Sequence, residues 1–121
     1  MGQAKDRGPI EKRLAQSVEA KRRVAESLEL VRRNLDELRE ELGLPSGAPF
    51  LGYVVHIPES DEFLANFNGI TFASYRSWTK NPAMARRFED FIDAYILVQK
   101  DIEIVVGLFE TDDQFIVAGI L

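Results

Sequence analysis

Heptad-spaced apolar residues between positions 24 and 42 constrain the fold of this chain more than any other feature. They alternate steps of four and three, the spacing of the apolar seam in a coiled coil. Pro9 can open a helix, and Gly43 followed by Pro45 ends one. We therefore predict one long helix over residues 9–43, after a disordered start at residues 1–8. The seam consists of Val24, Leu28, Val31, Leu35, Leu38 and Leu42.

Two interpretations of this seam are open. The seam can pair with the same helix of a second copy or with a helix of a partner, or it can lie along the sheet of its own chain. A helix of about 33 residues is roughly 50 Å long, which projects well beyond a small domain. We predict that the six seam residues mediate homodimerisation, because the last three heptads are regular.

The rest of the chain predicts a small antiparallel sheet. Residues 44–49 are rich in Pro, Gly and Ser and predict a hinge, and residues 50–121 predict a small acidic α+β domain. Residues 50–57 predict a strand, residues 63–78 an extended region with a turn at Asn68-Gly69, and the last two apolar runs a hairpin. Asn81-Pro82 opens a short helical turn, and Asp90 caps a buried helix. The predicted fold is α+β, a long N-terminal helix followed by a sheet in ββαββ order with one short and one buried helix.

Charge and composition narrow the partners. The net charge is −5, and residues 45–121 carry five Lys+Arg against eleven Asp+Glu, a balance of −6. This balance argues against direct nucleic-acid binding and favours a basic protein partner. The chain has no cysteine, no stretch of about 20 apolar residues and no signal-peptide core, so we expect a cytoplasmic protein without a membrane segment.

Basic and aromatic residues gather between positions 74 and 91, which hold the single tryptophan, Trp78. Arginine and tryptophan are enriched at protein interfaces, so this stretch can contact a partner. The alternative is that Trp78 belongs to the core and the cations pair with neighbouring carboxylates or with helix ends. The predicted partner-binding residues are Arg76, Lys80, Arg86 and Arg87.

The sequence contains no coherent catalytic or metal-binding pattern. His56 is the only histidine, and Ser60 and Asp61 follow it closely, but a catalytic triad also needs an oriented nucleophile and an oxyanion hole. The acidic loop at residues 110–113 lacks the alternating carboxylates and central glycine of a calcium loop, and aspartate is common in turns for backbone reasons. We predict no enzyme activity, no catalytic residue, no metal and no cofactor.

One loose pattern carries a resemblance. Trp78-Thr79, Pro82, Ala85 and Phe88, with Ala94 on the next helix, are similar to a small sheet-and-helix module of phage- and plasmid-borne proteins of unassigned function. In that module the tryptophan and the phenylalanine pack under the helix. The resemblance covers about residues 75–98 and implies a mobile genetic element.

Together these features predict a non-enzymatic, homodimeric binding protein. The concrete form is an accessory protein, either an adaptor or an inhibitor encoded by a mobile element, whose acidic surface meets a basic partner. The alternative is an oligomer that binds a small anionic ligand in a pocket between subunits, held by Arg86 or Arg87.

Overall fold

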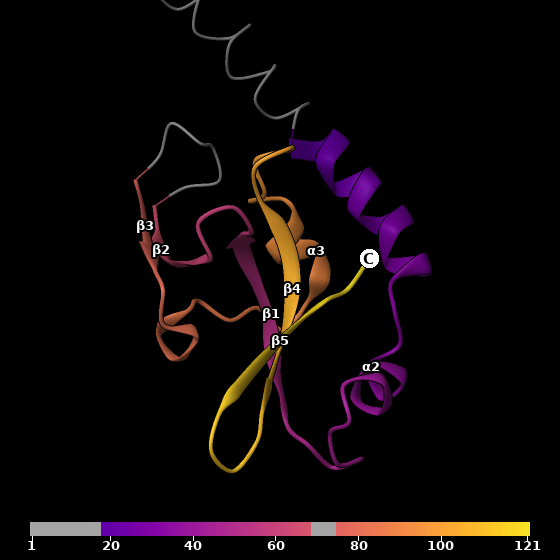
Figure 1. The fold of residues 1–121 in the computed structure, drawn as a ribbon. Helices are drawn as coiled ribbons and strands as arrows, with labels where there is room; N and C mark the ends of the chain where they lie inside the picture. Colours follow the sequence, from indigo (N-terminus) through magenta and orange to yellow (C-terminus); the bar gives the residue numbers. More distant parts are fainter. Residues whose placement is uncertain (1–17, 69–74) are drawn as a thin grey trace, which may run out of the picture.

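The computed structural model describes residues 18–68 and 75–121, which form an α+β fold (Figure 1). Five antiparallel strands lie in the order β3-β2-β1-β4-β5. A helix over residues 18–31 and two short helices, α2 and α3, pack on one side of the sheet. The labelled elements are α2 (Leu35–Glu41), β1 (Phe50–Ile57), β2 (Glu62–Phe67), β3 (Arg76–Thr79), η1 (Pro82–Met84), α3 (Phe91–Tyr95), β4 (Ile104–Glu110) and β5 (Phe115–Gly119).

The prediction of one continuous helix to residue 43 is wrong, because residues 32–34 are not helical. The Arg33 amide donates at 2.8 Å to the carbonyl of Ile120, the residue after β5, whereas in an unbroken helix this amide would bond within the helix. Asn34 then acts as the N-cap of α2, and its side chain accepts from the Asp36 amide at 2.7 Å. The part of the predicted helix before residue 18 lies outside the described residues.

The break divides the predicted seam between two helices and between two environments. Leu38 is only 1% exposed, and Leu28 and Leu35 pack against the core on the sheet. Val24 and Val31 are 48% and 71% exposed, and Leu42 is also exposed. Half of the seam therefore serves the protein's own core, which was the second interpretation of the heptad pattern.

The predicted ββαββ order is also wrong, because three strands precede α3. The extended region at residues 63–78 is a hairpin, in which β2 and β3 pair antiparallel from Phe63 opposite Thr79 to Phe67 opposite Arg76. The Asn68 amide donates to the carbonyl of Tyr75 at 2.9 Å, which continues the pairing of the two strands beyond Phe67 and Arg76. The predicted turn residue Gly69 lies outside the described residues.

The two faces of the sheet are covered differently. The first face carries the main core, where strand residues such as Val55 and Phe109 meet Ala25, Leu38 and Phe91 of the three helices. The second face carries a smaller cluster made of strand residues. Within the described ranges, only Ala85 joins that cluster from outside the strands, so no described helix covers the second face.

A loop segment enters the sheet between β1 and β2. These strands pair only at His56 opposite Phe63 and Ile57 opposite Glu62. Beyond that point Tyr53 exchanges two 2.8 Å backbone hydrogen bonds with Phe88, and the Arg86 amide donates to the Leu64 carbonyl at 2.8 Å. Residues 86–88 thus satisfy backbone groups that the diverging strands would leave unpaired.

Candidate functional site

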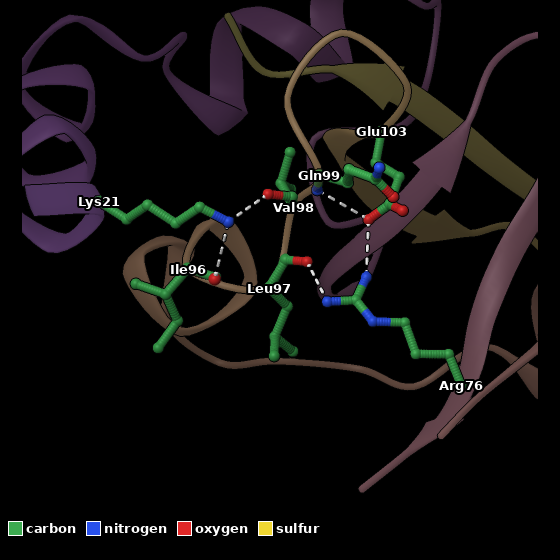
Figure 2. Close-up of polar contacts among 7 residues, drawn as sticks. All are labelled: Lys21, Arg76, Ile96, Leu97, Val98, Gln99 and Glu103. Atoms are coloured by element: carbon green, nitrogen blue, oxygen red, sulfur yellow. Dashed lines mark hydrogen bonds and ion pairs between the residues drawn. The ribbon is translucent and has the colours of Figure 1, made fainter. Parts of the chain in front are cut away.

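Arg76, a predicted partner-binding residue, lies in a buried ion-pair cluster at the C-terminal end of α3 (Figure 2). Its guanidinium donates to the Glu103 carboxylate at 2.9 Å and to the Leu97 carbonyl at 2.7 Å. The Gln99 amide donates to the same Glu103 oxygen at 3.0 Å. The side chains of Arg76 and Glu103 are 8% and 3% exposed. The charge of Arg76 is therefore neutralised inside the fold, away from the surface that a partner could contact.

Lys21 approaches the same cluster from the helix of residues 18–31. Its ammonium group donates to the Val98 carbonyl at 2.7 Å and lies 3.5 Å from the Ile96 carbonyl. Burial lowers the pKa of Lys21, repulsion by Arg76 lowers it further, and Glu103 partly offsets both. Lys21 and Arg76 thus donate to backbone carbonyls just after α3, which have no partner within the helix. A positive charge is favoured at this end of a helix.

The other predicted partner-binding cations lie at the surface. Lys80, Arg86 and Arg87 are exposed, and no ion pair within the described ranges involves them. The Arg86 guanidinium lies 5.5 Å from the centre of the Phe67 ring, a cation–π distance. These three residues are therefore available to a ligand, and none of them lines the groove at the β4–β5 loop.

An open groove lies where the 44–49 segment meets the β4–β5 loop. It has a volume of about 950 Å³. The Glu110 amide donates to the Pro49 carbonyl at 3.0 Å, which joins the two walls. Arg39 fixes one wall, because its Nε donates to the Ala48 carbonyl at 2.9 Å. The lining residues are Pro45, Gly47, Ala48, Pro49, Glu110, Thr111, Asp112 and Asp113.

The charge of this groove is negative. Glu110, Asp112 and Asp113 are exposed, and none of them takes part in an ion pair within the described residues. The Thr111 hydroxyl lies 3.0 Å from an Asp113 carboxylate oxygen and orients it. Pro45 and Pro49 expose apolar ring surface on the opposite wall. The groove therefore offers carboxylate acceptors beside apolar contacts, which suits a lysine or arginine side chain.

The side chains of His56 and Asp61 are in contact, but no serine hydroxyl bonds to His56 within the described residues. His56 Nε2 lies 2.9 Å from an Asp61 carboxylate oxygen, and its ring stacks on Phe63 at 4.6 Å. The Ser60 hydroxyl is buried and has no hydrogen-bond partner within the described ranges, so it is not bonded to His56. The pair therefore closes the β1–β2 turn.

Tyr53 gives the fold a testable response to alkaline pH. Burial raises the pKa of its hydroxyl, Arg32 opposes the rise, and Glu29 and Asp90 add to it. In the unfolded chain a tyrosine loses its proton near pH 10, whereas folded Tyr53 keeps it to a higher pH. The folded state then binds more protons, so the free energy of unfolding must fall as pH rises above about 10.

Tyr53→Phe is expected to remove that contribution. The free energy of unfolding of the variant should fall less steeply than that of the wild type between about pH 9 and 11. Urea unfolding at several pH values measures the slope. Tyr75→Phe, at an exposed tyrosine, is the matched control and should keep the wild-type slope. Equal slopes for wild type and Tyr53→Phe would contradict the prediction.

Comparison of the chain with protein-family models, curated proteins and solved structures found no match. The resemblance of residues 75–98 to the phage and plasmid module therefore stays a prediction. None of the helices in the described ranges is both long enough and apolar enough to cross a membrane. Within the same ranges, no three His, Asp or Glu side chains gather as a metal-binding group.

Sequence reasoning identified both walls of the groove but did not place them together. Residues 44–49 were expected to be a hinge and residues 110–113 a hairpin loop, each from its local composition. Their contact follows from the pairing of β1 with β4, in which Phe50 lies opposite Phe109. Both strands are strongly apolar, so either could have paired elsewhere in the sheet, and no local signal sets this pairing.

Proposed function

We propose that this protein is a non-enzymatic binding protein whose acidic groove receives an extended basic segment of a partner protein. The observation that carries the proposal is the groove between residues 45–49 and 110–113, with three carboxylates free of described ion pairs. Unpaired carboxylates at a groove rim form charge-assisted hydrogen bonds with incoming lysine or arginine. The adjoining proline rings can cover the alkyl part of the same side chain.

The charge distribution supports a protein partner over a nucleic acid. Residues 45–121 have a balance of −6, which repels phosphate and attracts a basic surface. A protein of this kind can occupy the nucleic-acid-binding surface of its partner by presenting carboxylates in place of phosphates. We propose that it acts in the cytoplasm as an adaptor or inhibitor, and the module resemblance adds the proposal of a mobile-element origin.

Neutralising the groove is expected to weaken the binding of a basic peptide about tenfold or more, because each exposed carboxylate contributes up to about 1 kcal/mol. The variant is Glu110→Gln/Asp112→Asn/Asp113→Asn. A fluorescein-labelled hexa-arginine peptide serves as the probe, and fluorescence anisotropy measures its Kd. The wild-type affinity should also fall between about 50 and 300 mM salt, since the pairs are exposed and therefore screened.

The control variant removes the same charge elsewhere. Glu40→Gln/Glu59→Gln/Glu89→Gln neutralises three exposed carboxylates that belong neither to the groove nor to a described ion pair. It should bind the peptide within about twofold of the wild type. Equal losses in the two triple variants would show that net charge alone attracts the peptide, and the groove proposal would then be withdrawn.

A further inference from the structure

We infer that the outer edge of β5 is an interface between two copies of this protein, which pair as antiparallel β5 strands. β5 ends the sheet on one side and β3 ends it on the other. Within the described residues, no strand other than β4 pairs with β5. An unpaired strand edge exposes backbone donors and acceptors that can bind a further strand. This inference does not depend on the acidic groove.

The two edges of the sheet differ in how they resist such pairing. β3 is four residues long and has an irregular register with β2 between Leu64 and Asn66. Short length and bulges both discourage an edge from pairing with another chain. β5 reads Phe-Ile-Val-Ala-Gly, without charge or proline, and pairs with β4 in continuous register. The β5 edge is therefore the more regular of the two and the better suited to accept a strand.

The direction of the backbone groups fixes which residues of β5 can pair outward. The Thr111 amide donates to the Gln114 carbonyl at 2.8 Å at the base of the β4–β5 hairpin. In an antiparallel ladder the direction alternates, so Ile116 and Ala118 also turn their backbone groups toward β4. The residues with outward-facing groups are Phe115, Val117 and Gly119.

These three residues are self-complementary around a two-fold axis at Val117. Antiparallel pairing sets Val117 opposite its own copy and Phe115 opposite Gly119 of the second copy. All three pairs are then of the hydrogen-bonded type, which gives about six backbone hydrogen bonds. A phenylalanine ring also covers an opposite glycine, a favourable cross-strand arrangement. The backbone groups of this edge therefore match those of a second copy from Phe115 to Gly119, and the Arg33 amide bonds the carbonyl of Ile120, one residue beyond this stretch.

Side chains and charges favour the same occupant. Phe115, Val117 and Leu51 lie on the second face of the sheet and are only partly buried. Pairing two β5 strands would join the second faces of both copies and extend this apolar surface across the interface. The acidic residues of the β4–β5 loops, Asp112 and Asp113, would lie at opposite ends of the strand pair and would not repel each other.

The test is sedimentation velocity of the full chain between about 10 and 200 µM, since a small interface gives a dimer in the micromolar range. Val117→Pro removes an outward N–H without removing a donor to β4, and Val117→Lys puts a charge at the edge. Both should raise the dimer Kd at least tenfold. Val117→Thr keeps the shape and the N–H, so it should stay dimeric. Circular dichroism verifies that each variant is folded.

Hydrogen exchange of the wild type gives a second readout that needs no variant. The amides of Phe115, Val117 and Gly119 should become protected as protein concentration rises, because only the dimer bonds them. A wild-type monomer at about 200 µM would overturn the inference. So would a dimer that survives Val117→Lys but dissociates in Val24→Asp/Val31→Asp, which would place the interface on the exposed seam residues of the helix instead.

Discussion

Arg76→Met is expected to lower the free energy of unfolding by about 3–5 kcal/mol, the usual cost of removing one partner of a buried ion pair. The substitution leaves the Glu103 carboxylate, which is 3% exposed, with one described donor, the Gln99 amide. It also removes the donor to the Leu97 carbonyl at the end of α3. Methionine fills much of the volume of the arginine chain, so the loss reports on charge more than on packing. Urea unfolding, monitored by far-ultraviolet circular dichroism, measures this loss in the free energy of unfolding.

Variants at both positions separate the contribution of the pair from that of its surroundings. Glu103→Gln keeps an acceptor near Arg76 and should cost less than Arg76→Met. Arg76→Met/Glu103→Leu removes both charges and should recover much of the loss, because a buried pair is often replaceable by apolar side chains of similar volume. Arg86→Met, at an exposed arginine without a described ion pair, is the matched control and should change stability by less than about 0.5 kcal/mol. If Arg76→Met changed the free energy of unfolding as little as Arg86→Met, the cluster would be hydrated and would contribute little to stability.

Local sequence signals predicted several short elements of this fold, although Asp90, at the N-cap position of α3, makes no side-chain capping hydrogen bond. Asn81 caps η1 as expected, with its side chain accepting from the Ala83 amide at 3.0 Å, and Pro82 occupies the first turn. Pro58 follows directly on the end of β1. These features depend on residues within a few positions of one another, so the local sequence determines them. The general class, α+β with an antiparallel sheet, followed from the same signals.

The failures involve long-range contacts. The break before α2 depends on Asn34, which can cap a helix or sit inside one, and on the carbonyl of Ile120, which is distant in sequence. Arg76 was expected at the surface because arginine is usually exposed, and the buried Glu103 that binds it lies 27 positions away. Heptad spacing likewise cannot distinguish a seam that meets another helix from one that meets a sheet, and here Leu28, Leu35 and Leu38 meet the core.

Gly52→Ala is expected to lower the free energy of unfolding by about 3 kcal/mol, through backbone strain and overpacking together. Gly52 has φ of +141°, a conformation that side-chain-bearing residues rarely adopt. A Cβ there would lie 2.9 Å from the carbonyl oxygen of Phe88, a backbone atom that cannot rotate away. Phe88 is bonded to Tyr53 in both directions, so relief of the clash would weaken the loop that fills the gap between β1 and β2.

Gly47→Ala provides the control for this substitution. Gly47 has no heavy atom within 4 Å of its ideal Cβ position and does not need a positive φ. Alanine there should leave stability unchanged or raise it slightly, since it reduces the freedom of the unfolded chain. Urea unfolding of both variants below about 5 µM keeps self-association out of the comparison. If the two variants were equally stable, residues 86–88 could move away from β1 at little cost. The close approach of the loop would then not be what requires a glycine at position 52.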